Sequence, residues 1–283
     1  MAIRMVGLDL DGTLFNSAKE LTAHTKEILE KAMAAGVVIV PATGRPKTGL
    51  PKCLSELEGI RYAVVTNGGG LYDLREGRFI YERCMEREAS IELMERTRRL
   101  EHAVQGVFIG EWGYMEPVDF ERTANLPLVE AMKDYIRSSR KVVESIPALI
   151  RESAEQPQKL VIMFYADETG HMPDLARARA ITDQYPQFSV VSGGVGNVEI
   201  TDAAAGKGTA LLALGELLGI SREEIMAVGD SENDLDMILK AGLGVAMANG
   251  EDIIREHADA ITASNDEEGV AQAIEKYVLG GRA

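Results

Sequence analysis

The sequence is poor in basic residues, and this shortage limits the partners it can have. Its 283 residues include 30 Lys and Arg against 45 Asp and Glu, which gives a formal net charge of −15. Binding to DNA or RNA draws much of its strength from Lys and Arg at the phosphates, so we expect no nucleic-acid partner. If the substrate is itself an anion, a local group must reverse the acidic field.

Cysteines and long apolar runs are also scarce. Cys53 and Cys84 are too few for a disulfide framework or a zinc site, and they indicate reduced thiols. The longest apolar stretch, residues 34–40, is far shorter than the ~18 residues of a membrane span. Asp9 and Asp11 interrupt the first apolar stretch, which argues against a signal peptide. We expect a cytoplasmic protein with no membrane partner, and the sequence does not indicate its oligomeric state.

Strands and helices alternate at both ends of the chain. Short apolar runs typical of buried parallel strands occupy residues 3–8, 37–40, 62–65, 225–228 and 245–247. Amphipathic stretches typical of helices lie at about residues 22–35, 54–57, 207–218, 235–240 and 270–277. This alternation predicts an α/β fold with a Rossmann-like, doubly wound parallel sheet.

The middle of the chain has a different pattern. Longer amphipathic stretches alternate there with strand-like runs such as residues 160–165, and the one tryptophan, Trp112, lies among them. We therefore predict an inserted α+β cap domain over residues 84–193. The catalytic core would be formed by residues 1–83 and 194–283.

Three polar clusters follow strands of the predicted core. They are residues 9–13, 43–45 and 229–234. In open parallel sheets, ligands bind beyond the carboxyl ends of the strands, so these clusters should meet at one edge of the sheet.

The clusters would bring four carboxylates together, those of Asp9, Asp11, Asp230 and Asp234. Such a group is costly unless a cation lies among its members. Oxygen ligands without a nearby His or Cys suit Mg²⁺ or Mn²⁺ rather than zinc. Protein-bound Mg²⁺ usually meets a phosphate as well, so the sequence predicts a metal site for a phosphorylated substrate.

The same edge offers groups that suit a phosphate. Thr43 supplies a hydroxyl, Gly44 an open backbone N–H, and Lys207 a positive charge at the start of a helix. A carboxylate such as Asp9 can attack phosphorus and form an aspartyl phosphate, which water then cleaves. A second group must protonate the leaving oxygen and later activate the water, and Asp11 is the candidate.

These residues resemble the four motifs of the haloacid dehalogenase-like (HAD) phosphatase superfamily. The string Asp9-x-Asp11-Gly12-Thr13 matches the first motif, Thr43 the second, Lys207 the third, and Gly229-Asp230-x-x-Asn233-Asp234 the fourth. Further stretches are similar to the Cof-type subfamily, IIB, namely residues 43–46, 66–68, 199–200, 206–208, 244–249 and 265–271.

The resemblance implies a role for each residue of the site. Asp9 would be the nucleophile and a Mg²⁺ ligand, and Asp11 the general acid and base and a ligand through its backbone carbonyl. Asp230 would complete the protein ligands of the metal, and Asp234 would support Lys207 or the metal from behind. The phosphate would be contacted by Asp9, Asp11, Gly12, Thr43, Gly44, Lys207 and Asn233.

Together these features predict a Mg²⁺-dependent phosphomonoester hydrolase acting on small phosphorylated metabolites, in particular sugar phosphates. Arg45 would either contact the substrate or form a structural ion pair. Two alternatives remain open at this point. A phosphohexomutase would use the same carboxylates but return the phosphoryl group to the sugar, and a silent sensing module would bind a phosphorylated metabolite without turning it over.

Overall fold

The computed structural model describes residues 2–55, 57–193 and 196–280, and the chain folds into two compact units. The core unit comprises residues 1–44, 51–82 and 206–283. The cap unit comprises residues 45–50 and 83–205.

A five-stranded parallel sheet forms the centre of the core unit, with the strand order β14-β13-β12-β1-β2. These strands are β1 (Met5–Leu8), β2 (Val38–Pro41), β12 (Ile225–Gly229), β13 (Leu243–Ala246) and β14 (Ala260–Ile261). β1 lies between β12 and β2, where Leu8 is in register with Val228 on one side and Pro41 on the other. The β-branched and apolar residues of these strands are almost all buried, as expected for a sheet covered on both faces.

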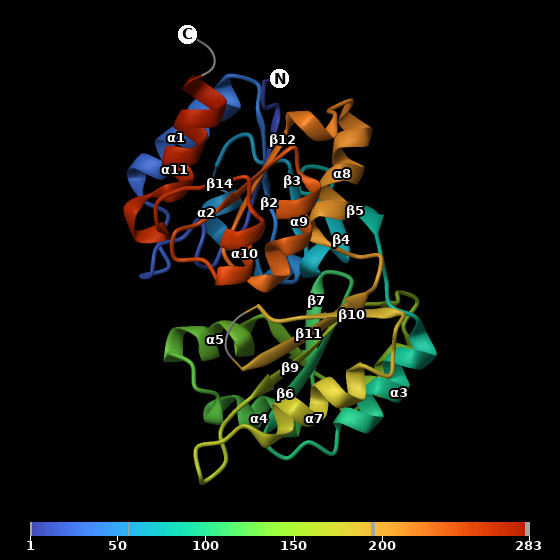
Figure 1. The fold of residues 1–283 in the computed structure, drawn as a ribbon. Helices are drawn as coiled ribbons and strands as arrows, with labels where there is room; N and C mark the ends of the chain where they lie inside the picture. Colours follow the sequence, from blue (N-terminus) through green and yellow to red (C-terminus); the bar gives the residue numbers. More distant parts are fainter. Residues whose placement is uncertain (1, 56, 194–195, 281–283) are drawn as a thin grey trace. The chain divides into compact units, whose positions relative to one another are not determined.

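Helices cover both faces of this sheet. They are α1 (Ala23–Ala34), α8 (Lys207–Leu218), α9 (Leu235–Lys240), α10 (Asp252–His257) and α11 (Gly269–Ile274), and a short helix, α2 (Lys52–Ser55), precedes β3. Figure 1 shows α1 beside α11 on one side of the sheet, and α8 with α9 on the other. The predicted doubly wound parallel core is therefore confirmed.

A small antiparallel sheet adjoins β2. It consists of β3 (Tyr62–Val65), β4 (Gly70–Asp73) and β5 (Arg78–Glu82), with a turn at residues 74–77 between the last two strands. β3 runs parallel to the chain beyond β2 and meets it through a single bridge between Ala42 and Val64. The predicted strand at residues 62–65 therefore contacts the parallel sheet only beyond the end of β2 and belongs to a separate sheet.

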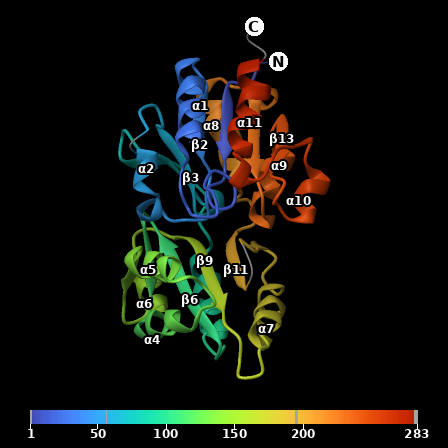
Figure 2. The ribbon, with the colours of Figure 1, turned by 90° about the vertical axis from the view of Figure 1, so that its left-hand side faces the viewer.

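The cap unit is a six-stranded sheet with helices packed on it (Figure 2). Its order is β10-β11-β9-β6-β7-β8, formed by β6 (Ala103–Ile109), β7 (Trp112–Met115), β8 (Arg140–Val142), β9 (Pro157–Phe164), β10 (Phe188–Val191) and β11 (Asn197–Asp202). The helices are α3 (Arg87–Thr97), α4 (Pro117–Arg122), α5 (Glu130–Ser138), α6 (Ile146–Glu152) and α7 (Pro173–Thr182).

The two faces of the cap sheet are packed by different helices. One face carries Val107, Leu160 and Ile200, which form the main apolar cluster of this unit with residues of α3, α6 and α7. On the other face, Val104 and Met115 pack with Ile136 of α5. The alternation of side chains along each strand thus separates two packing layers.

The predicted limits of the cap differ from the structure at one end. The sequence analysis placed the return of the core at residue 194, which lies outside the described residues, so the run at residues 198–200 fell within the predicted core. In the structure that run is part of β11, which pairs with β9 and β10 in the cap sheet. The apolar run predicts a strand, but local sequence cannot say which sheet the strand joins. Residues 45–50 also cluster with the cap unit, which the sequence did not indicate.

Candidate active site

Asp9 is the first residue beyond β1, which lies between β12 and β2 in the parallel sheet. Its backbone N–H donates to the Val228 carbonyl at 3.0 Å, and the N–H of Ala42 donates to the carbonyl of Leu8 at 2.7 Å. These bonds hold the ends of β12, β1 and β2 side by side. Asp9 is only 5% exposed, so its carboxylate is buried at the sheet edge and has little contact with solvent.

Lys207 links two of the predicted carboxylates. Its Nζ donates to Oδ1 of Asp9 at 2.6 Å and to Oδ1 of Asp234 at 2.6 Å, and the lysine itself is fully buried. Burial disfavours the charged form of Lys207 and acts to lower its pKa. The negative charges of Asp234 and Asp9 outweigh this effect, so the pKa of Lys207 is raised. Lys207 therefore stays protonated and holds a fixed positive charge at this edge.

Asp230 lies on the loop after β12, and its carboxylate is positioned from the first motif. The Thr13 hydroxyl donates to Oδ1 of Asp230 at 2.7 Å. Gly12 has a φ of +91°, and a Cβ there would lie 2.5 Å from Oδ2 of Asp230. Both the backbone conformation and the close approach therefore require glycine between Asp11 and Thr13.

Asp234 holds the loop after β12 through hydrogen bonds to its backbone. Its Oδ2 accepts the backbone N–H groups of Asp230 at 2.9 Å and Ser231 at 3.1 Å, while its Oδ1 accepts from Lys207. A Cβ at Gly229 would lie 2.5 Å from the Cβ of Asp234, so a glycine at the end of β12 lets the loop fold back on the strand.

The carboxylates of Asp9, Asp230 and Asp234 could hold a metal ion. One oxygen from each lies within 4.8 Å of the others, and Lys207 is the one cation that donates to any of them among the described contacts. Burial, followed by the charge of Asp234, raises the pKa of Asp9 and raises that of Asp230 to about 7. Such crowded negative charge fits a bound cation, and a donor set of oxygens alone suits a hard one.

The carboxylate of Asp11 does not join those of Asp9, Asp230 and Asp234. β1 ends at Leu8, so Asp9 and Asp11 are not on the same face of a strand, and the chain turns through hydrogen bonds from Leu14 and Phe15 back to residues 9 and 10. The carboxylate of Asp11 accepts from Lys19 Nζ at 3.0 Å and is about one-third exposed. The sequence grouped four carboxylates, and the structure groups three of them.

The remaining predicted residues of the core unit lie at the same sheet edge. Thr43 is buried two residues beyond β2, and its N–H donates to the Val64 carbonyl at 2.9 Å. Gly44 follows it and is half-buried. Asn233 lies in the loop after β12, where its Nδ2 donates to Oδ1 of Asn67 at 3.3 Å.

Comparison with known proteins decides the family. The family model of the haloacid dehalogenase-like hydrolases matches residues 6–274, almost the whole chain. The chain belongs to this family. The match includes both units, so the cap is part of the family pattern and not a foreign insertion.

Several relatives of this HAD-family hydrolase are named phosphatases. Phosphatase YwpJ of Bacillus subtilis is 30% identical over 98% of this chain and 100% of its own length. A second B. subtilis protein, 5-amino-6-(5-phospho-D-ribitylamino)uracil phosphatase YwtE, is 28% identical over 98% of this chain and 99% of its own. The predictions of this superfamily and of a phosphatase enzyme are confirmed.

A solved structure shares the fold of this HAD-family chain over both units. The HAD subclass IIB sugar phosphatase BT4131 superposes with a TM-score of 0.78, covering 97% of this chain and 98% of its own, at 21% identity. None of the helices in the described part of the chain combines the length and the apolar character needed to span a bilayer.

The structure of this HAD-family hydrolase adds residues that the sequence analysis did not assign. Thr13 orients Asp230, and Asn67, just beyond β3, contacts Asn233. Asn249 donates to the Gly12 carbonyl at 2.8 Å. All three lie in loops that follow strands of the core unit, within stretches that the sequence analysis noted without giving these residues a role. Each is a short polar residue of the kind common in turns, so its type alone does not indicate what it contacts.

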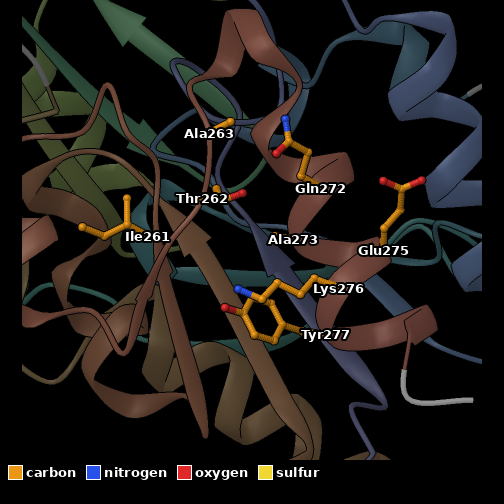
Figure 3. Close-up of a pocket in the computed structure, with 8 residues that line it drawn as sticks. All are labelled: Ile261, Thr262, Ala263, Gln272, Ala273, Glu275, Lys276 and Tyr277. Atoms are coloured by element: carbon orange, nitrogen blue, oxygen red, sulfur yellow. The ribbon is translucent and has the colours of Figure 1, made fainter.

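A separate hollow of about 560 Å³ lies in the core unit of this HAD-family protein (Figure 3). Residues 261–263 line it from β14 and the loop that follows, and residues 272, 273 and 275–277 from the C-terminal helical segment. None of the predicted site residues is among those shown. The hollow is therefore a feature apart from the acidic cluster.

Proposed function

We propose that this protein is a Mg²⁺-dependent phosphomonoester hydrolase that acts on small phosphorylated metabolites, sugar phosphates in particular, through an aspartyl-phosphate intermediate. One observation carries the proposal, the buried carboxylate of Asp9 held by Lys207 beside Asp230. A carboxylate can attack phosphorus as a nucleophile. A neighbouring cation holds the carboxylate in place and offsets its negative charge. The name of the relative YwtE, whose substrate carries its phosphate on a ribityl chain, supports a sugar-like leaving alcohol.

The side chains of Asp9 and Asp230 would hold the Mg²⁺ ion, with Asp234 behind them. The donor set fits because three carboxylates face one lysine, so a divalent cation would balance the charge. When bound, Mg²⁺ supplies positive charge that offsets the negative charge of the phosphate and of the carboxylates.

The chain's own residues supply the rest of the chemistry. The Asp9 carboxylate attacks phosphorus, the ester P–O bond breaks, and the leaving alcohol takes a proton from the protonated Asp11. Asp11 is then a carboxylate, and it accepts a proton from the water that attacks phosphorus of the aspartyl phosphate. The P–O bond to Asp9 breaks, inorganic phosphate leaves, and both aspartates return to their starting states. Lys207, buried against Asp9, keeps this carboxylate in a fixed position throughout.

A screen of phosphate esters tests the proposal most directly. We expect inorganic phosphate to be released from sugar phosphates faster than from nucleotides, pyridoxal phosphate or flavin mononucleotide, because the specificity proposed is for a sugar-like alcohol. Conversion of a hexose 1-phosphate into the 6-phosphate without release of phosphate would contradict hydrolysis and indicate a mutase. Lack of reaction with every ester would indicate a binding module.

Replacing Asp11 with asparagine should slow both half-reactions. Loss of a general acid and base typically costs about 10²- to 10⁴-fold in rate. With p-nitrophenyl phosphate the leaving group needs little protonation, so Asp11→Asn should release a burst of nitrophenol and then turn over slowly. Rapid-mixing absorbance would detect the burst. The exposed Glu20→Gln in the same loop is the matched control, and an unchanged steady-state rate in Asp11→Asn would contradict the role.

Removing the metal should lower both activity and stability. EDTA should stop turnover and Mg²⁺ restore it. In the metal-free chain Asp230 has a raised pKa of about 7, so stability is lost as pH rises from about 4 through 7, where this buried carboxyl must ionise. The rise in Tm on adding Mg²⁺ should therefore be larger at pH 8 than at pH 5.5, measured by calorimetry. Equal Tm values with and without Mg²⁺ at pH 8 would contradict a metal at this cluster.

A further inference from the structure

The loop that follows β3 in the core unit has an unusual backbone. Its residues Thr66, Asn67 and Gly68, the 66–68 loop, have φ angles of +52°, +56° and +87°, all in the left-handed region. Asparagine and glycine accept this region readily, but a β-branched threonine rarely adopts it. Thr66 is also fully buried, and its hydroxyl has no hydrogen-bond partner in the described part of the chain. Both features are unfavourable, so the contacts around the loop must hold it in this conformation.

The backbone of the 66–68 loop contacts the second and third motifs of the site. The N–H of Asn67 donates to the carbonyl of Thr43 at 3.1 Å. A Cβ at Gly68 would lie 2.1 Å from the carbonyl oxygen of Gly206 and 2.8 Å from the backbone nitrogen of Lys207. The glycine therefore lies directly against the start of α8. One short loop thus packs against the backbone at both motifs.

The side chain of Asn67 contacts the fourth motif. Asn67 is only 4% exposed, and its Oδ1 accepts from Nδ2 of Asn233 at 3.3 Å. At the other end of the same amide, Oδ1 of Asn233 accepts from the Ser231 hydroxyl at 3.2 Å. A serine hydroxyl can donate or accept, so it fits the amide of Asn233 in either orientation. The Asn67 oxygen can only accept, and it therefore decides which way this amide points.

The Asn233 amide has one donor left over. An amide nitrogen carries two N–H groups, and Asn67 accepts one of those on Asn233. The other has no acceptor among the residues that the structure describes. Asn233 is half-buried, so a small anion can reach this N–H. If the amide were flipped, its oxygen would stand in that place and would repel an anion.

We propose that Asn67 is a positioning residue, which orients the amide of Asn233 and so keeps the second N–H of Asn233 for the phosphate. The inference rests on the proposed function, in which Asn233 contacts the phosphate. Asn67 acts through Asn233 and does not itself touch the substrate in this role. The left-handed backbone of the 66–68 loop brings its side chain to Asn233, which accounts for an unfavourable conformation at this place.

Replacing Asn67 with glycine tests the role of its side chain. Glycine adopts the same φ and keeps the N–H that donates to Thr43, so the variant loses only the amide. We expect the KM for phosphate esters and the Kd for inorganic phosphate to rise about 3- to 10-fold in the presence of Mg²⁺, as for the loss of one hydrogen bond. The kcat should change little, because Asn233 would contact the phosphate before and during the reaction. Phosphate-release kinetics and titration calorimetry are the measurements.

A double-mutant cycle shows whether Asn67 acts through Asn233. Asn233→Ala removes the amide that Asn67 orients, so adding Asn67→Gly to it should raise KM and Kd no further. A residue with a purely structural role would weaken binding by the same factor in either background. Asn67→Ala should lower the Tm more than Asn67→Gly does, because alanine opposes a φ of +56°.

Asn125→Gly is the matched control, since Asn125 is exposed in the cap unit, and it should leave KM and Kd unchanged. Wild-type turnover with unchanged KM and Kd in Asn67→Gly would contradict the inference and leave the phosphatase proposal intact. The same factor in both backgrounds of the cycle would also contradict it. Lack of turnover by the wild type would contradict the proposed function, and the titrations with inorganic phosphate would then decide the inference by themselves.

Discussion

Asp9→Asn is expected to abolish turnover, with a loss of about 10⁴-fold or more in kcat, comparable to removal of a nucleophile in other covalent mechanisms. The amide is nearly the same size as the carboxylate and can still accept the hydrogen bond from Lys207. It cannot form the acyl phosphate through a free carboxylate oxygen. Phosphate release under single-turnover conditions is the measurement, with mass spectrometry of quenched wild-type enzyme to locate a phosphoryl group on Asp9.

The fold should survive this substitution. Burial and the charge of Asp234 raise the pKa of Asp9, so removing its charge relieves repulsion among the three carboxylates of the metal-free chain. The Tm of metal-free Asp9→Asn should therefore equal or exceed that of the wild type. Asp266→Asn, which changes an exposed carboxylate of the core unit, is the matched control and should keep full activity. Substantial turnover by Asp9→Asn would rule out this residue as the nucleophile.

Lys207→Met should reduce both activity and stability. It leaves the carboxylates of Asp9 and Asp234 buried without their shared cation, and breaking such a buried pair typically costs about 3–5 kcal/mol. Activity should fall by about 10²- to 10³-fold, as when one fixed electrostatic group is removed from a reaction site. Since the pKa of Lys207 is raised, the lysine itself stays protonated between pH 5 and 9. Denaturation curves and phosphate-release kinetics measure the two effects.

A double substitution separates the two roles of this lysine. Lys207→Met combined with Asp234→Asn removes one of the stranded carboxylates, so it should recover part of the lost stability. It should not recover activity, because the charge beside Asp9 remains absent. Lys207→Arg keeps the positive charge but changes the shape of the side chain. It takes the place of Lys207→Met in the experiment if the methionine variant does not fold. Full activity in Lys207→Met or in the double variant would contradict a role for Lys207 at the phosphate.

Much of the core unit follows from local sequence. Apolar runs such as 225–228 are long enough and β-branched enough to predict buried parallel strands, and the apolar face of 207–218 predicts the helix that packs on them. Because parallel strands end at a common edge, the placement of Asp9, Thr43 and Asp230 near one another also follows from the sequence. Lys207 could be placed at the start of its helix by pattern, and the structure starts α8 there.

Other features depended on contacts between residues far apart in the chain. The carboxylate of Asp11 turns toward Lys19 because β1 ends at Leu8, and strand length is set by pairing with β2 and β12. Asp234 accepts from Lys207 through a loop whose fold-back is permitted at Gly229. Neither the end of a strand nor the path of a loop is encoded by spacing alone.

The sequence by itself determined the family, the parallel core and the residues gathered at its edge, because these depend on local patterns and on motifs of fixed spacing. Only the tertiary structure decided that β11 joins the cap sheet and that three carboxylates rather than four share one place. The physical reason is that strand pairing and register are nonlocal: a strand of suitable composition can join either sheet, and the free energy of packing against its neighbours makes the choice.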